Sequence, residues 1–271
     1  MREALRRTLP VIVVVAALLA VWYAAALVVD APQGALAEKR PLLPTPQQVA
    51  GALLAGILQP PTSPRSLIYH AGVTAASAAA GFALAFVLGI GLAIAIVNVR
   101  LLDRSLMPWI IASQTVPALA VAPMVVVVLG NIGLTGLVPK ALIAAWLSFF
   151  PIVTSMVAGL RSPERIQLDL LRTYSAGGWD VFAQLRWPAS MSFLFPGMKV
   201  AATLAVVGAI VAELPTGAQA GLGARLLAAS YYGQTLQLWA ALVMASLLAV
   251  VVVGVVDGAR GVLVRVRGGR L

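Results

Sequence analysis

Long runs of apolar residues limit most strongly what this chain can fold into. Six of them come close to the roughly 20 residues that a helix needs to cross a hydrocarbon core, at about 10–29, 70–97, 106–129, 138–159, 194–213 and 236–256. Of the 271 residues, 61% are hydrophobic and 10% are charged, too few charges to cover a soluble globule of this size. The runs lack the alternation of a membrane β-barrel. We therefore predict an all-α integral membrane protein with six transmembrane helices.

The basic residues predict how the spans are oriented. If both termini are cytoplasmic, 14 of the 19 Lys and Arg residues fall in inner segments, as the positive-inside rule requires. The remaining five are Lys39, Arg40, Arg65, Lys140 and Arg225. The net charge of +10 is scattered singly between apolar runs, without the basic stripe and stacking aromatics of a nucleic-acid surface. We interpret it as topology information and expect a lipid membrane, and no nucleic acid, as the surrounding partner.

The spans divide the chain into three parts. Residues 1–69 hold the first transmembrane helix and an outer loop with a short helix, 70–258 hold a five-helix core with a cytoplasmic loop at 161–192, and 259–271 form a basic cytoplasmic tail. The first apolar run follows basic residues as in a signal peptide, but it is long for one, so we predict a retained span with cleavage as the alternative. In the outer loop, Thr45-Pro46 predicts the start of a helix that rests on the membrane surface or against the bundle.

The cytoplasmic loop carries the strongest local pattern. Ser162-Pro163-Glu164 predicts a helix start, with a serine cap, proline at the first position and an acid in the first turn. Gly177-Gly178 predicts a break, after which Asp180 can cap a second short helix that Pro188 ends. The general interpretation is a surface hairpin that closes two spans. The alternative is a docking element for a cytoplasmic partner, because both helices present apolar faces outside the bilayer.

This loop resembles the cytoplasmic EAA loop of ABC importer permeases. Asp169 stands at the acid of that motif, Leu170-Leu171 at its two alanines, Ser175 at its glycine and Trp187-Pro188 at its Leu-Pro pair. If the family glycine relieves a tight turn between two helices, Gly177 and Gly178 are candidates to have taken over that task. The residues that the resemblance assigns to coupling with an ATPase are Asp169, Tyr174, Ser175, Ala176, Gly177, Gly178, Trp179, Phe182 and Pro188.

Further segments match the family in order along nearly all of residues 10–258, such as Gln114-Thr115-Val116-Pro117 and Gly221-Leu222-Gly223. The resemblance is closest to the branch that imports nitrate, sulfonates, taurine and pyrimidine-type compounds. It implies a type I importer fold and a homodimer in the bacterial plasma (inner) membrane. It also implies two ATPase subunits, which bind the ATP and Mg²⁺, and an extracytoplasmic solute-binding protein. Residues 215–217 and 230–234 resemble the permeases for pyrimidine-like compounds.

Polar residues in or near the spans are candidates for the solute pathway, because they are costly to place there. We select Gln114, Thr115 and Pro117 in the third span and Glu213 at the outer end of the fifth. The alternatives are interhelical hydrogen bonds for the first two and, for Glu213, an interfacial carboxylate in water or paired with Arg225. His70 is interpreted as a helix-end residue at headgroup level. The small residues Ala75, Ala79 and Ala83 are expected to form a helix contact.

The sequence contains no phosphate loop, no Ser/His/Asp arrangement, no cysteine and one histidine. We therefore expect no catalytic residue, no metal site and no cofactor in this chain. The first alternative function is a stand-alone secondary transporter or channel, although ion coupling would call for ionisable groups that the middles of these spans almost lack. A membrane enzyme would need a catalytic cluster, which the sequence does not offer.

Overall fold

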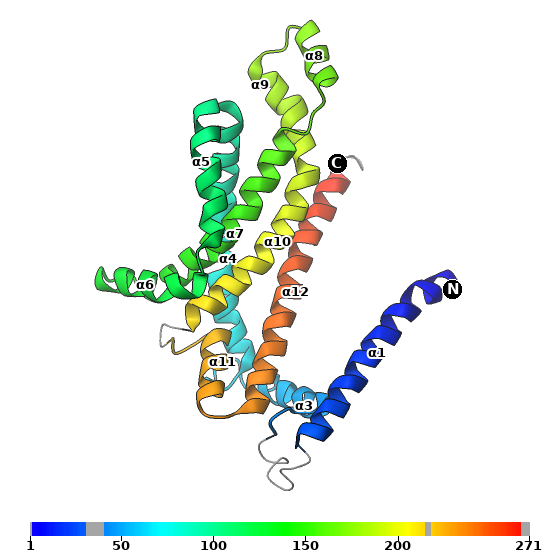
Figure 1. The fold of residues 1–271 in the computed structure, drawn as a ribbon, viewed down its shortest axis with the longest axis vertical. Coiled ribbons are helices and arrows are strands. Elements are labelled where there is room, and N and C mark those ends of the chain that lie inside the picture. Colours follow the sequence, from blue (N-terminus) through cyan, green and yellow to red (C-terminus); the bar gives the residue numbers. More distant parts are fainter. Residues whose placement is uncertain (1, 31–40, 215–217, 267–271) are drawn as a thin grey trace.

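The computed structural model describes residues 2–30, 41–214 and 218–266, with side chains for 9–30, 41–214 and 218–265, and every element in these ranges is helical. Five helical segments are long and apolar enough to cross a membrane, and a bent pair of helices raises the number to six if it counts as one span. The predicted all-helical membrane fold is therefore confirmed. The described helices form an elongated bundle with short helices at both ends (Figure 1).

Three long helices form the centre of the bundle: α4 (Leu67–Asn98), α7 (Leu137–Leu160) and α10 (Trp187–Glu213). Helices α4 and α7 approach closely at Gly81 and Gly89, where an added Cβ would lie 2.5 Å from the Ala144 Cβ and 2.9 Å from the Ile152 Cγ2. Small residues permit such contact between membrane helices. The face of α4 that packs therefore runs through Ala78, Gly81, Ala85, Gly89 and Ala93, all buried.

The predicted small-residue stripe on α4 is wrong by one helical position. Ala79 and Ala83 are exposed and Ala75 is only half-buried, while Ala78 and Ala85 are buried. Every face of this helix offers small or apolar residues, so composition alone did not identify the packing face. The close approach at Gly81 marks it, because Gly81 is the one glycine of α4 at which an added Cβ would collide with the α7 backbone.

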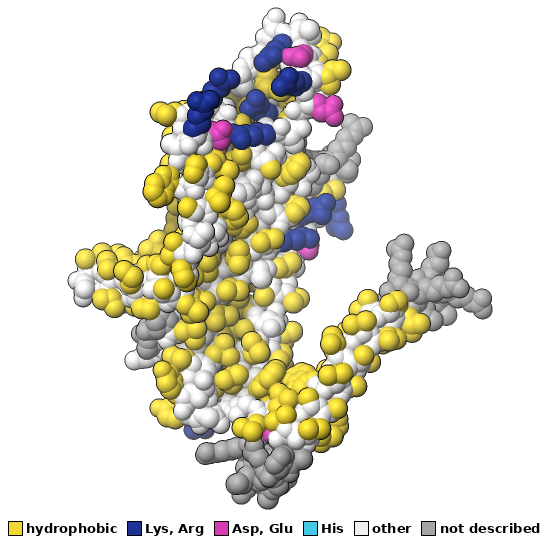
Figure 2. Space-filling model, in the orientation of Figure 1, with side chains coloured by type: hydrophobic (Ala, Val, Ile, Leu, Met, Phe, Trp, Pro, Cys, Tyr) yellow, Lys and Arg dark blue, Asp and Glu magenta, His cyan; other side chains and the backbone are white. Residues whose placement is uncertain are grey.

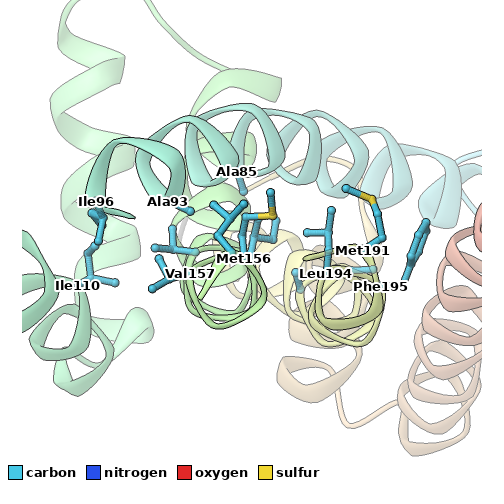
Figure 3. Close-up of a cluster of buried hydrophobic side chains, with 14 of the residues drawn as sticks. Ala85, Ala93, Ile96, Ile110, Met156, Val157, Met191, Leu194 and Phe195 are labelled. Atoms are coloured by element: carbon cyan, nitrogen blue, oxygen red, sulfur yellow. The ribbon is translucent and has the colours of Figure 1, made fainter. Parts of the chain in front are cut away.

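An apolar core joins five helices, α4, α5, α7, α10 and α12, in the half of the bundle near the C-terminal end of α4. Ala85 and Ala93 of α4 face Met156 of α7 and Leu194 of α10 (Figure 3). Ile96 lies beside Ile110 of α5 (Arg100–Ala112) at the edge of the same core. The long central helices are thereby held as one unit, which positions everything attached to their ends.

The third predicted span is not one continuous helix, although its two halves together pass as one bent span. Helix α5 and the 3-10 turn η2 (Ser113–Thr115) are followed by α6 (Ala118–Asn131), which is bent by 100° from the preceding segment. The residue before a proline is driven out of the helical region, and Val116 and Pro117 both adopt extended backbone (ψ 122° and 116°). Helix α6 projects sideways from the bundle in Figure 1.

The remaining spans are α1 (Arg2–Asp30) and α12 (Thr235–Val266). Helix α12 packs along α10, whereas α1 diverges from the bundle and touches it near its C-terminal end (Figure 1). Helix α12 runs through residues 259–266, the first part of the predicted basic tail, and 267–271 lie outside the described residues. The predicted short helix is α3 (Pro46–Ile57), capped by Thr45 with Gln48 completing the capping box, and it packs against α12 and α4.

Charge divides the molecule into two ends. Exposed arginines gather around the α4–α5 junction and the short helices α8 (Arg165–Thr173) and α9 (Gly178–Val181), at the top of Figure 2. We call this the basic end. The opposite end holds α3, the start of α4 and α11 (Leu222–Tyr231). Apolar side chains dominate the visible surface between the ends (Figure 2).

Candidate functional site: a helical loop and a buried polar cluster

The loop at 161–192 lies at the basic end and is helical, as predicted, but it begins differently. The N-cap of α8 is Glu164, whose amide donates to the Gln167 side chain (3.0 Å), and the helix starts at Arg165. Ser162 instead donates its hydroxyl to the Gly159 carbonyl at the end of α7. The predicted serine cap is therefore wrong by two residues, because Ser162 is used to finish the preceding helix.

The turn after α8 is made at Ser175. Its φ of 56° makes it the one non-glycine residue with left-handed backbone in the described ranges, while Gly177 has φ −70°. The Ser175 and Ala176 amides donate to the Arg172 and Leu171 carbonyls, the pattern of a left-handed helix C-cap. Gly177 and Gly178 have therefore not taken over the turn. The residue at the position of the family glycine keeps the glycine-like conformation.

The second helix of the loop does not end at Pro188. Helix α9 continues through a π-helical turn, η3 (Phe182–Arg186), directly into α10, so the helical path runs from Gly178 to Glu213. Pro188 lies in the first turn of α10, directly after the π-helical turn, where the hydrogen-bond pattern of the helix changes. Asp180 accepts a hydrogen bond from the Gly177 amide (3.0 Å) and so supports the start of α9 from within the helix, because the N-cap is Gly177 and not Asp180 as predicted.

Three aromatic rings stack along this continuous path. The Trp179 and Phe182 ring centroids are 5.6 Å apart, and those of Phe182 and Trp187 are 6.0 Å apart. Trp179 is 76% exposed and Tyr174 is 77% exposed, whereas Phe182 is half-buried against the core. Two of the predicted coupling aromatics therefore project freely, and the third connects them to the bundle.

The other predicted residues of the loop are also at its surface. Asp169 forms an exposed ion pair with Arg172 (2.9 Å), one turn along the same helix. Ala176, Gly178 and Phe182 contribute to a groove of about 440 Å³ whose far wall is the C-terminal turn of α4. The loop thus offers exposed aromatic side chains beside a groove.

A buried polar cluster lies toward the opposite end, where α4, α7 and α10 meet the loop before α11. Glu213 is fully buried and accepts hydrogen bonds from the Thr74 hydroxyl (3.0 Å) and the Gly223 amide (2.8 Å). The Lys140 ammonium lies 3.7 Å from Glu213 Oε1 and donates to the Ala220 carbonyl (3.1 Å). A buried carboxylate needs such partners, because leaving water is costly for a charge.

Two glycines allow the segment Gly221–Gly223 to pack closely around the Glu213 carboxylate. Gly221 has φ 128°, and a Cβ there would collide with the Glu213 carboxyl group. A Cβ at Gly223 would collide with the Ile210 carbonyl and lie 2.8 Å from the Glu213 Cβ. The Leu222 amide between them donates to Thr74 Oγ1 (2.8 Å). The Gly221-Leu222-Gly223 segment is therefore shaped to fit around Glu213.

Both alternatives to a pathway role that were considered for Glu213 are wrong. The carboxylate is neither in contact with bulk water nor paired with Arg225, since its basic partner is Lys140 and Arg225 donates to Gln237 (2.6 Å). His70 lies in the first turn of α4, near the helix end where it was predicted. It is buried, its Nδ1 accepts from the Gly221 amide (3.1 Å), and its Nε2 bonds to the Pro64 carbonyl (2.9 Å).

Sequence reasoning missed Thr74 and Lys140 as members of this cluster. A signal was present for Lys140, because a lysine four residues into an apolar span calls for a buried acid as partner. Thr74 gave no such signal, because its hydroxyl could equally have bonded within its own helix.

The other predicted pathway residues lie at the bend between α5 and α6. Gln114, Thr115 and Pro117 are exposed on the single chain. Thr115 donates to the Ala112 carbonyl (2.8 Å) and Gln114 to the Ser113 hydroxyl (3.4 Å), so both bond within their own segment and not to a neighbouring helix. The structure therefore groups these three residues together and gives Glu213 a separate set of partners.

Comparison with known proteins gives a consistent result. Residues 85–266 match the family described as binding-protein-dependent transport system inner membrane component. A riboflavin transport system permease protein of Chloroflexus aurantiacus is 31% identical over 68% of this chain and 65% of its own length, just under two thirds. A formylaminopyrimidine transport permease protein of Halalkalibacterium halodurans is 33% identical over 67% of this chain and 68% of its own. A probable ABC transporter permease protein of Haemophilus influenzae is 27% identical over 88% and 89%.

Proposed function

The chain belongs to the family of binding-protein-dependent inner membrane components, the permease subunits of ABC transporters, and from that premise we propose that it carries a small organic solute inward when a separate ATPase moves its helical loop. The loop would dock on the ATPase through Tyr174 and Trp179. Movement at the loop would then reach the far ends of the spans.

The observation that carries this proposal is the unbroken helical path from Gly178 to Glu213. Its 36 residues extend about 54 Å at 1.5 Å per residue. Trp179 lies at one end of this path and the buried polar cluster at the other. A displacement of α9 by a partner therefore has a stiff route to Glu213, which holds the Gly221–Gly223 segment.

The exposed aromatics support the docking part of the proposal. Large aromatic side chains anchor protein interfaces when they enter pockets of a partner, and Trp179 and Tyr174 are each more than three quarters exposed. Asp169 is paired with Arg172 and contributes less, because an exposed ion pair is worth about 0–1 kcal/mol. We assign ATP and Mg²⁺ binding to two ATPase subunits.

We further propose a homodimer that receives its solute from an extracytoplasmic binding protein. Helix α6 supports the dimer, because it projects from the bundle with Leu119, Met124, Val127 and Val128 exposed. In a two-fold assembly, the polar bend at Gln114, Thr115 and Pro117 would line the path between two copies. Glu213 would act at the end of this path by holding the loop that closes it.

We assign the basic end to the cytoplasm of a bacterial inner membrane, with both termini on that side. The concentration of arginines at that end supports this orientation. A cysteine introduced at exposed Gln47 in α3 should react with an impermeant thiol reagent added outside, and one at Gly178 should not. Labelling at Gly178 from outside would reverse the assignment.

For the solute, we propose a small nitrogen heterocycle of the pyrimidine type. The names of two relatives, transporters of riboflavin and of formylaminopyrimidine, support this class. Thermal-shift screening of the cognate binding protein should find stabilisation by such heterocycles, with nitrate, taurine and alkyl sulfonates as the competing set. Stabilisation by the anions alone would move the substrate to the sulfonate class.

The decisive experiment is reconstitution in liposomes. Uptake should require the permease, the ATPase, the binding protein and ATP together, and Trp179→Ala should abolish uptake without preventing insertion of the permease. Uptake by the permease alone, driven by an ion gradient or by the solute gradient, would support the alternative function of a secondary transporter or channel.

A further inference from the structure

A second polar site lies at the end opposite the loop, between α3, α11 and the start of α12. It is a pocket of about 580 Å³, which we call the arginine pocket. Its polar lining consists of Gln59, Arg65, Arg225, Gln234 and Gln237. The buried side chains Glu213, Thr74, Lys140 and His70 do not line this pocket. The bend at residues 113–117 does not line it either. The function proposed above therefore makes no use of this pocket.

Both arginines line the pocket, and no acid is among its lining residues. No ion pair among the described residues involves Arg65 or Arg225. Arg225 is half-buried, and its Nε is completely buried without a hydrogen-bond partner. Burial lowers the pKa of Arg225, and the charge of Arg65 lowers it further. Two like charges in one pocket repel unless something negative lies between them.

The donor set indicates what that negative group is. Guanidinium groups bind tetrahedral oxyanions through several parallel N–H···O bonds, and the glutamine amides can supply further donors. We propose that the arginine pocket binds a phosphate-type oxyanion between Arg65 and Arg225.

The position of the pocket favours the phosphate of a lipid headgroup over the free ion. Arg65 lies two residues before the first residue of α4, and Gln237 lies in the first turn of α12, so the pocket is at the headgroup level of two spans. Its remaining lining is apolar, with Ala52, Leu67 and Ala240 beside the guanidinium groups. A lipid phosphate on the arginines could therefore place its first acyl carbons against an apolar wall. This argument holds for either orientation of the chain.

A neighbouring aromatic pair is consistent with that level. The Trp22 and Trp239 rings stack with centroids 5.1 Å apart, and Trp239 directly precedes the pocket residue Ala240. Tryptophan is enriched where the hydrocarbon core meets the headgroups. The arginine pocket thus combines cationic side chains with an apolar wall at the membrane boundary.

The test uses the full-length protein in nanodiscs and measures its midpoint of thermal unfolding. One arm raises the fraction of phosphatidylglycerol in phosphatidylcholine, because the phosphate of phosphatidylglycerol carries a net negative charge whereas that of phosphatidylcholine is neutralised by its own choline. The other adds inorganic phosphate to phosphatidylcholine nanodiscs at constant ionic strength. The variants are Arg65→Gln, Arg225→Gln and the charge-conserving Arg225→Lys. The control is Arg104→Gln, which removes an exposed arginine at the basic end.

We expect phosphatidylglycerol to stabilise the wild type and the Arg104→Gln control equally. Arg65→Gln and Arg225→Gln should each weaken the apparent affinity about tenfold, the scale of one lost charge-assisted hydrogen bond, and Arg225→Lys should lie between. Stabilisation by phosphate and not by the lipid would support the oxyanion site with the free ion as its source. Arg65 is exposed, so Arg65→Gln keeps the test valid if Arg225→Gln does not fold.

Three results would overturn the proposal. The first is an equal response of the wild type and both glutamine variants to lipid and to phosphate. The second is higher stability of the glutamine variants without any ligand response, because the arginines would then only repel each other. The third is loss of uptake in Arg65→Gln and Arg225→Gln while their binding of lipid and phosphate is unchanged. The arginines would then bind a carboxylate of a protein partner and not a phosphate.

Discussion

The helical loop at the basic end and the buried polar cluster at the opposite end use polar and aromatic residues in contrasting ways. In the loop, the large side chains Tyr174 and Trp179 are exposed and the ion pair Asp169–Arg172 is local. In the cluster, Glu213 is fully buried and bonds to residues as far away in sequence as Thr74. The cluster is complete within one chain. The helical loop exposes aromatic side chains that a partner protein would cover. Helix α10 connects the loop to the cluster.

The comparison predicts the largest loss of stability in the cluster. Glu213→Ala should lower the free energy of unfolding by about 3–5 kcal/mol, because it leaves Lys140 buried without its acid. Glu213→Gln should cost less, since the amide can still accept from Thr74. Asp257→Ala is the matched control, because its ion pair with Lys199 is half-exposed and should cost about 0–1 kcal/mol. Equal midpoints of thermal unfolding for Glu213→Ala and Asp257→Ala would break the contrast between the two ends.

The second prediction separates docking from folding within the loop. Trp179→Ala should weaken association with the ATPase by about 2 kcal/mol or more, the scale of an interface anchor, and leave thermal stability unchanged. Phe182→Ala should lower both, because Phe182 is half-buried and stacks on Trp187. Trp109→Ala is the control, since Trp109 is 75% exposed on α5. Co-purification of the ATPase at wild-type levels with Trp179→Ala would refute the docking assignment.

The third prediction concerns the turn at Ser175. Ser175→Gly should stabilise the protein by about 0.5–1 kcal/mol, because glycine adopts a φ of 56° without steric cost. Ser175→Val should destabilise it by more, since a β-branched residue fits that conformation poorly. Gly178→Ala serves as the comparison, because a Cβ at Gly178 meets no atom within 4 Å. If Ser175→Gly and Ser175→Val had the same thermal stability, the turn would not be set by this residue.

The smallest effect is expected at Asp169. Asp169→Ala removes an exposed ion pair one turn along α8, and such pairs contribute about 0.2–0.5 kcal/mol. ATPase association should fall less than with Trp179→Ala. A larger loss of association in Asp169→Ala than in Trp179→Ala, at equal stability, would show that charge and not aromatic contact dominates docking.

Local signals were sufficient for much of the fold. The lengths of the apolar runs predicted the spans at α4, α7 and α12, because a bilayer selects uninterrupted apolar helices. Thr45 and Pro46 predicted the start of α3, because a cap acts within one turn. The same reasoning failed at Pro117, because the apolar run at 106–129 was predicted as one transmembrane helix and instead bends by 100° there.

The sequence by itself therefore determined the helical membrane class, most span boundaries and the family, because these depend on residues close together in the chain. Only the tertiary structure decided that Glu213 meets Thr74 and Lys140, across 139 residues in the first case. It also decided that Gly81 selects the packing face of α4 and that Arg65 and Arg225 line one pocket. Such contacts depend on how helices cross and on their register, and helices that are apolar on all sides leave that register unspecified until they pack.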